Sequence, residues 1–250
     1  MRIIVCLGNV PDTTTKVKFV EDNTKFDTAG VQWVINPWDE LALTRAMELK
    51  EDSGNSVDKV SVITVGGKNT EPTIRKALAI GADDAVRIDL NPEDSYVTAY
   101  QMAEYLKNEQ EPHFVFAGIE SSDYNGAATG GMLAELLGVP SVSSVSGFDL
   151  EGDKARISRE IDGGTEFLLV DLPLVAIVQK GIAKEPRIPA MRGIMMARKK
   201  PLNIVPPTDI EALTEIAGFE LPGSKPPCKM IDADNAKELI GLLQNEAKVL

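Results

Sequence analysis

Short apolar runs alternate with amphipathic stretches through most of the chain. Runs rich in Val and Ile are typical of strands that a parallel sheet buries on both faces. Between these runs, apolar residues recur at the spacing of a helix face, as at Ile74, Ala77 and Leu78. The pattern predicts an α/β fold with a doubly wound, mostly parallel sheet. The expected strands are residues 3–7, 59–65, 85–90, 114–118, 141–146 and 174–178.

Three segments depart from this alternation. Residues 154–172 hold two β-type runs joined through Asp162-Gly163-Gly164, which predicts a β-hairpin inserted at the edge of the sheet. A second hairpin is expected near the N-terminus, between 17–19 and 31–35, just before a helix that Asn36 caps. Six prolines between Pro201 and Pro227 predict an extended arm that is poor at forming sheet or helix. A final amphipathic helix, capped by Asp232, should end this arm.

The sequence therefore predicts two parts. Residues 1–200 should form the α/β domain, and residues 201–250 should form an arm whose helix docks on another body. The chain has 250 residues, of which 43% are hydrophobic, so it is long enough to bury a large core.

Charge and composition exclude several kinds of function. A net charge of −12 argues against general nucleic-acid binding, although residues 180–200 form a basic segment with Glu185 as its one acid. Two cysteines and one histidine leave little scope for a metal site or a catalytic triad, and they fit a reducing compartment. Without a presequence pattern or a long apolar run, we expect a cytoplasmic protein with no membrane insertion.

A strand, a turn of small residues and a helix follow one another between 114 and 137. The turn, Gly126-Ala-Ala-Thr-Gly-Gly131, leaves the first N–H groups of the helix accessible, and Thr129 adds a hydroxyl. Such a helix start can hold one phosphate group. The alternative is an ordinary turn that uses small residues only for close packing.

One motif is specific enough to indicate a family. The sequence Arg159-Glu160-Ile161-Asp162-Gly163-Gly164, followed by Glu185-Pro186-Arg187 and the segment from Gly193 to Lys200, resembles the β subunit of electron transfer flavoprotein. The resemblance covers nearly the whole chain. It implies a Rossmann-like, adenine-nucleotide-binding domain that holds AMP, in a heterodimer whose α subunit carries the redox FAD. The cofactor-binding positions that it implies are Cys6, Asn36, Trp38, Val65, Gly118, Asp123, Asn125, Gly126, Ala127, Ala128 and Thr129.

Some of these assignments have simpler alternatives. Cys6 is better explained as a small buried apolar side chain, even if AMP lies next to it. Glu160 is implied to pair with an arginine of the α subunit, but without the resemblance it reads as a solvated hairpin acid. Residues 184–200 match the loop that docks dehydrogenases such as acyl-CoA dehydrogenase, with Arg187, the anchor Met191 and Arg192 as contact residues. Without the resemblance this segment reads as a solvated surface helix.

Two other functions compete with this interpretation. The first is an electron-bifurcating relative that carries a second FAD in place of AMP; its usual Val-Gly-Pro is Thr129-Gly130-Gly131 here. The second is an ATP-using enzyme or nucleotide-binding stress protein. It is disfavoured because the chain lacks a Gly-x-x-x-x-Gly-Lys-[Ser/Thr] motif and residues 118–131 contain no Lys or Arg. We expect an electron-carrier subunit without catalysis of its own.

Overall fold

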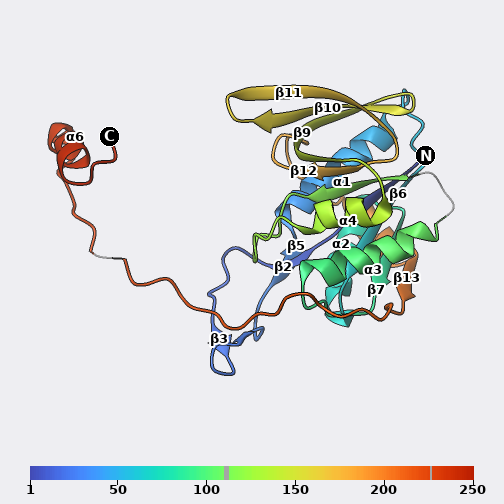
Figure 1. The fold of residues 1–250 in the computed structure, drawn as a ribbon, viewed down its shortest axis with the longest axis horizontal. Helices are drawn as coiled ribbons and strands as arrows, with labels where there is room; N and C mark the ends of the chain where they lie inside the picture. Colours follow the sequence, from blue (N-terminus) through green and yellow to red (C-terminus); the bar gives the residue numbers. More distant parts are fainter. Residues whose placement is uncertain (110–112, 226) are drawn as a thin grey trace.

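A nine-stranded sheet forms the centre of the molecule (Figure 1). The computed structural model describes residues 1–109, 113–225 and 227–250. Its strands are β1 (Arg2–Cys6), β2 (Asn9–Pro11), β3 (Phe19–Val20), β4 (Lys25–Phe26), β5 (Trp33–Ile35), β6 (Lys59–Val65), β7 (Asp84–Ile88), β8 (His113–Gly118), β9 (Ser141–Glu151), β10 (Lys154–Ile161), β11 (Gly164–Asp171), β12 (Val175–Val178) and β13 (Leu202–Val205). Its helices are α1 (Pro37–Glu51), the short 3-10 helix η1 (Lys68–Thr70), α2 (Glu71–Ile80), α3 (Ser95–Lys107), α4 (Thr129–Leu137), α5 (Met191–Ala197) and α6 (Ala236–Asn245).

The strand order confirms the predicted doubly wound sheet. The order is β11-β10-β9-β12-β8-β1-β6-β7-β13, and all neighbours pair in parallel except β10, which is antiparallel to β9 and β11. From β1 the chain builds outward through β6 and β7, and it then returns to place β8 on the other side of β1. The direction of winding therefore reverses between β1 and β8, which is where doubly wound sheets leave a crevice at the carboxyl ends of their strands.

Two apolar cores lie on the two faces of the sheet. Alternate residues of β1 point to opposite faces, so Ile3 and Val5 join the core under α1 and α2. Ile4 and Cys6 join the core under α3 and α4. Because all five residues of β1 are buried, this strand reads as one continuous apolar run in the sequence.

The hairpin over residues 154–172 is present, and it extends the sheet at one edge. β10 and β11 pair from Lys154↔Asp171 to Ile161↔Gly164, and Gly163 has the positive φ of 86° that the turn requires. β9 runs on to Glu151, beyond the predicted end at residue 146, because it continues past the parallel sheet to pair with β10.

The N-terminal hairpin differs from its prediction. β3 pairs with β4 through a turn in which residues 21–23 have positive φ, while β2 pairs with β5. The predicted pairing of 17–19 with 31–35 is therefore wrong. The apolar residues that suggested it are used separately, since Phe19 stacks on Phe219 and Trp33 packs edge-on against Phe26.

The proline-rich arm is not free of sheet structure. Residues Leu202–Val205 pair in parallel with Ala85–Ile88 and form the edge strand β13. The prolines at 201 and 206 flank this strand, so they limit its length without removing its hydrogen bonds. Of the arm's prolines, the one at position 226 lies outside the described residues.

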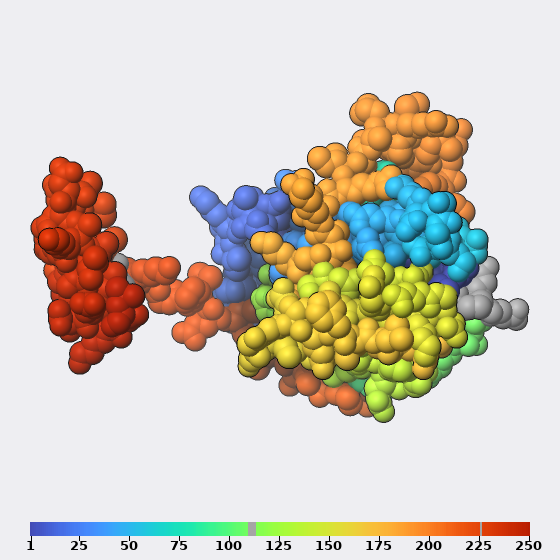
Figure 2. Space-filling model, turned by 90° about the horizontal axis from the view of Figure 1, so that it is seen from above, coloured from blue at the N-terminus to red at the C-terminus, as the bar shows by residue number. Residues whose placement is uncertain are grey.

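The last helix begins later than predicted. α6 starts after Asn235, and Asp232 instead accepts a hydrogen bond from the Asp234 N–H in the preceding turn. No residue of α6 is buried, although Leu239 and Ile240 face one side of it. Figure 2 shows this helix standing apart from the α/β body at the end of the arm.

The short helix α5 is held tightly against α2. Arg75 of α2 donates from Nη1 to the carbonyls of Ala197 and Lys200, each at 2.8 Å. In return, Lys200 Nζ donates to the carbonyls of Leu78, Gly81 and Ala82 at the end of α2. Lys200, one of the basic residues of the 180–200 segment, thus interacts favourably with the negative end of the α2 helix dipole.

Candidate functional site: a pocket at the carboxyl edge of the sheet

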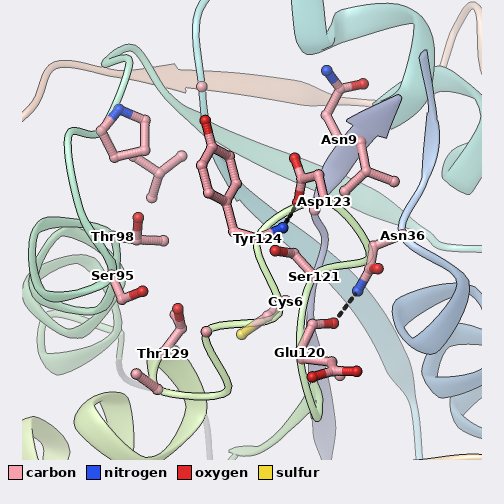
Figure 3. A pocket seen from close by; sticks show the side chains of 18 of the residues that line it. Cys6, Asn9, Asn36, Ser95, Thr98, Glu120, Ser121, Asp123, Tyr124 and Thr129 are labelled. Carbon is pink, nitrogen blue, oxygen red and sulfur yellow. Dashed lines mark hydrogen bonds between the residues drawn. The ribbon is translucent and has the colours of Figure 1, made fainter. Parts of the chain in front are cut away.

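A pocket of about 670 Å³ opens where β1, β6 and β8 end (Figure 3). It lies at the reversal of winding between β1 and β8, and α3 and α4 supply its other wall. The hydroxyl side chains Ser95, Thr98 and Thr129 gather on one side of it, with Asn36 and Glu120 on the other (Figure 3). The crevice expected of a doubly wound sheet is therefore present.

Most of the predicted cofactor-binding positions line this pocket. They are Cys6, Asn36, Val65, Gly118, Asp123, Gly126, Ala127, Ala128 and Thr129. Trp38 and Asn125 do not line it. Trp38 instead packs beside Gly118, since a Cβ on that glycine would come within 2.7 Å of the Trp38 Cβ.

Asn36 ties two loops of the pocket together. Its side-chain amide donates from Nδ2 to the Glu120 carbonyl at 2.9 Å and accepts at Oδ1 from the Ser122 N–H at 3.2 Å. Asn36 is the N-cap residue of α1, as the sequence predicted, but its side chain makes no capping bond to the helix. The buried amide makes its hydrogen bonds to the loop after β8, whose Glu120 is 84 residues away in the sequence.

The sequence analysis missed Asp39, which joins the ends of β1 and β8. One carboxylate oxygen accepts from the Gly8 N–H at 2.7 Å, and the other accepts from the Gly118 N–H at 2.8 Å. A Cβ on Gly118 would lie 2.3 Å from Asp39 Oδ1, so the glycine makes room for this carboxylate. Asp39 gave no sign of this role in the sequence, because local sequence carries no signal for so distant a contact.

Burial raises the pKa of the two ionisable side chains at the floor of the pocket, Asp39 and Cys6. Burial raises the pKa of the Asp39 carboxyl from 3.8 to about 6, although the hydrogen bonds that it accepts oppose the rise. Burial, together with the Asp39 charge, raises the pKa of the Cys6 thiol, so Cys6 stays protonated at neutral pH. A neutral thiol in an apolar core behaves as a small apolar side chain, as the simpler interpretation of Cys6 expected.

The start of α4 has the features that the sequence predicted for an anion. The first N–H groups of a helix have no carbonyl partner within it, and in α4 these belong to Thr129 and the residues just after it. The preceding loop is pre-shaped, since Ala127 has a φ of 49°, a conformation that residues with side chains rarely adopt. Gly130 serves packing instead, because a Cβ there would come within 2.9 Å of Ile177.

The charged side chains that line the pocket are acidic. Among the described residues that line it, none is Lys, Arg or His. The acidic residues that line it are Asp39, Glu93, Asp94, Glu120, Asp123 and Glu215. A ligand with several negative charges would meet a repulsive field here, whereas a single phosphate can still be held by main-chain N–H groups. Within the described ranges, no three His, Cys, Asp or Glu side chains are grouped to hold a metal ion.

Comparison with known proteins identifies the family. A family model described as "Electron transfer flavoprotein domain" matches residues 23–210. The electron transfer flavoprotein subunit beta of Bacillus subtilis (strain 168) is 34% identical over the whole of both chains. The chain belongs to the electron transfer flavoprotein beta-subunit family.

Other relatives of the family agree with this result. A protein of the same name from Syntrophomonas wolfei subsp. wolfei is 33% identical over 90% of this chain and 87% of its own. The mitochondrial beta subunit of Oryza sativa subsp. indica is 32% identical over the whole of both chains. The resemblance inferred from the hairpin motif is therefore confirmed, and electron transport is the process in which the family takes part. In the described part of the chain, no helix has the length and apolar character to cross a membrane.

In this member of the family, the predicted partner-binding residues fall into two separate regions. Glu160 lies on β10 in the hairpin at one edge of the sheet and accepts a hydrogen bond from Gln179 Nε2 at 2.8 Å. Met191 and Arg192 lie exposed on α5, which packs on α2 in the other half of the sheet. Arg187 is paired within the chain, with Nη1 2.7 Å from Glu51, so its charge is partly engaged.

Several pocket residues were not predicted at all. Asp94, Ser95 and Thr98 come from the start of α3, and Thr214 to Ile216 come from the arm. Ser95 and Thr98 lie three residues apart on one helix face, in the first turn of the helix that follows β7 after a short loop. This is a signal that sequence reasoning could have used. The arm residues carry no such signal.

The geometry of Asp39 predicts an unusual dependence of stability on pH. Because its carboxyl binds a proton more tightly in the folded than in the unfolded chain, protonation below a pKa of about 6 favours the folded state. The free energy of unfolding of the wild type, relative to Asp39→Asn, should rise by about 1 kcal/mol between about pH 7 and about pH 5. Urea unfolding of both proteins across this range measures the difference. A flat difference, or one that falls toward low pH, would contradict the assignment.

Proposed function

We propose that the chain is the AMP-binding subunit of a heterodimeric electron transfer flavoprotein. In this role it supports the FAD of an α subunit and helps to pass electrons from dehydrogenases to a downstream acceptor. The observation that carries the proposal is the pocket at the reversal of winding, whose described lining residues include no cation and whose wall includes the start of α4. The relatives are named as beta subunits, which supports an α-subunit partner. Some are named as mitochondrial, so the cytoplasmic location remains a prediction.

The residues present fit a nucleoside monophosphate. The adenine and ribose would lie against the strand ends at Cys6, Val65 and Gly118, where the lining is mainly main chain and small apolar groups. The phosphate would accept hydrogen bonds from the N–H groups at the start of α4 and from the Thr129 hydroxyl. When bound in the α subunit, FAD would supply the redox chemistry, and this chain's part is to hold the nucleotide and the partner in place.

The same pocket argues against the ATP-using alternative. A triphosphate would need cationic side chains or a metal ion to offset its charge, and the described lining residues provide acids instead. The bifurcating alternative, with a second FAD in this pocket, differs in the ligand that the purified protein should contain.

The first test is therefore to identify the ligand. The chain should be purified with its α subunit, and its extracted nucleotides should contain about one AMP and one FAD per heterodimer. Thr129→Val removes one hydroxyl donor at almost constant volume, so it should weaken AMP binding by roughly tenfold to a hundredfold, as for a hydrogen bond to a charged oxygen. Thr13→Val, at an exposed loop residue, is the matched control. Two FAD and no AMP would favour the bifurcating alternative.

The end of the arm is proposed to bind the α subunit. Residues 221–250 include α6, whose side chains are all at least partly exposed, and they lie beyond the arm segment that contacts the body. Deletion of these residues should abolish the heterodimer. Their apolar side chains would stabilise it by about 25 cal/mol for each Å² of apolar surface that they bury against the α subunit. Gel filtration measures assembly, and circular dichroism of the truncated chain checks that the α/β domain still folds. A heterodimer of unchanged stability would refute this docking role.

The exposed apolar residues of α5 are proposed to dock a dehydrogenase. Met191 is 75% exposed, and the bonds between α2 and α5 hold its helix rigidly. Met191→Ala should slow electron transfer from the partner dehydrogenase at least tenfold, the size expected of a docking anchor worth roughly 2 kcal/mol. AMP content and heterodimer stability should not change. Met132→Ala, on α4, controls for loss of an exposed methionine. Equal rates in the wild type and Met191→Ala would exclude Met191 as the anchor.

A further inference from the structure

After β13 the arm runs along the body past α3 toward β3 before it leaves the body (Figure 1), and part of it lines the pocket. Its first anchor is Gln101, a buried residue of α3 whose amide makes two hydrogen bonds to the main chain of Thr208, at 2.6 and 2.9 Å. Its last anchor is Phe219, whose ring stacks on Phe19 at 4.8 Å and whose N–H donates to the Asn23 carbonyl at 2.8 Å. Between these anchors, Thr214, Glu215 and Ile216 line the pocket.

Asp94 is the middle anchor, and it stands at the point where the arm, α3 and the pocket meet. Its Oδ1 caps α3 by accepting from the Val97 N–H at 2.7 Å. Its Oδ2 accepts three bonds from the arm: from the Leu213 N–H at 2.8 Å, the Thr214 N–H at 3.0 Å and the Thr214 hydroxyl at 3.2 Å. One carboxylate thus joins the wall of the pocket that α3 provides to the wall that the arm provides.

The arm depends on such polar contacts because it buries little apolar surface. All residues from 213 to 218 are exposed. Hydrogen bonds to a carboxylate are about twice as strong as those between neutral groups, so Asp94 contributes a large share of what holds this segment. Although burial opposes ionisation, the bonds from Val97, Leu213 and Thr214 lower the pKa of the Asp94 carboxyl, so these contacts persist at neutral pH.

We propose that Asp94 is a positioning residue that holds residues 213–216 across the mouth of the pocket and thereby sets how slowly the bound nucleotide leaves. The inference rests on the proposed function for the identity of that nucleotide, AMP. Asp94 itself need not touch the ligand. It acts through the arm, which must move aside before a ligand between α3, α4 and the strand ends can escape.

The variant Asp94→Asn separates the two roles of this residue. Asparagine is as good an N-cap as aspartate, so α3 keeps its cap and the fold keeps its stability. The amide has only one acceptor oxygen, so with that oxygen on Val97 its NH₂ group faces the N–H groups of Leu213 and Thr214 and cannot bind them. Phe219→Ala loosens the arm from its far end without touching α3. Asp209→Asn, on the exposed arm, is the matched control for loss of one negative charge.

Two measurements on the heterodimer test the proposal. Release of radiolabelled AMP into an excess of unlabelled AMP should be at least tenfold faster in Asp94→Asn than in the wild type, because several bonds to one carboxylate are lost. Release should also be faster in Phe219→Ala, because the ring contact with Phe19 is lost. Hydrogen–deuterium exchange of residues 208–219 should rise in both variants. The melting temperature of the ligand-free protein should change little, and Asp209→Asn should match the wild type in every respect.

Unchanged AMP release despite faster exchange of the arm would overturn the proposal, since the arm would then not limit escape. Unchanged exchange in Asp94→Asn would overturn it too, because Asp94 would then not hold the arm. If the purified protein carries FAD in this pocket, the proposed function fails in its choice of ligand, and the same release experiment on FAD decides the role of Asp94. If it carries no nucleotide, the proposed function fails, and the exchange of residues 208–219 still shows whether Asp94 holds the arm.

Discussion

The buried carboxylate of Asp39 is the interaction on which the pocket depends. A doubly wound sheet leaves a crevice where its winding reverses, but the two strands that border the crevice end in separate loops. Asp39 accepts the N–H of Gly8 after β1 and the N–H of Gly118 at the end of β8, and so fixes the two loop starts relative to each other. Burial of a charge is costly, which is why the pKa of this carboxyl is raised to about 6. The hydrogen bonds recover part of that cost.

The second constraint is electrostatic. The chain is acidic overall, and the described side chains that line the pocket include several acids and no cation. Any phosphate bound there must be held by main-chain N–H groups and hydroxyls, which are neutral donors. Such a site would favour ligands with few charges, because each further phosphate would add repulsion without adding a partner. The basic residues of the chain are used elsewhere, as where Lys200 caps α2 and Arg75 binds the end of α5.

The arm connects the pocket to the outer surface of the molecule. β13 makes the start of the arm part of the sheet, and the contacts to Gln101, Asp94 and Phe19 carry it past the pocket. Only beyond Phe219 does the chain leave the body, ending in a helix with no buried residue (Figure 2). One continuous segment therefore supplies an edge strand, a wall of the pocket and an exposed apolar helix. β7 holds the edge strand, and Asp94 of the pocket wall holds the middle of the segment.

The sequence by itself determined the six parallel strands β1, β6, β7, β8, β9 and β12 with the helices between them, the hairpin over 154–172, the start of α4 and the family. These features are local: apolar periodicity, turn residues and short motifs report on neighbours within a few positions. Only the tertiary structure decided which side chains face the pocket. The bonds of Asn36, Asp39 and Asp94 span tens of residues to more than a hundred, and a buried polar side chain chooses its partner by position in space. The edge strand β13 was hidden for the same reason, because prolines lower local strand propensity while the free edge of β7 supplies the missing hydrogen bonds.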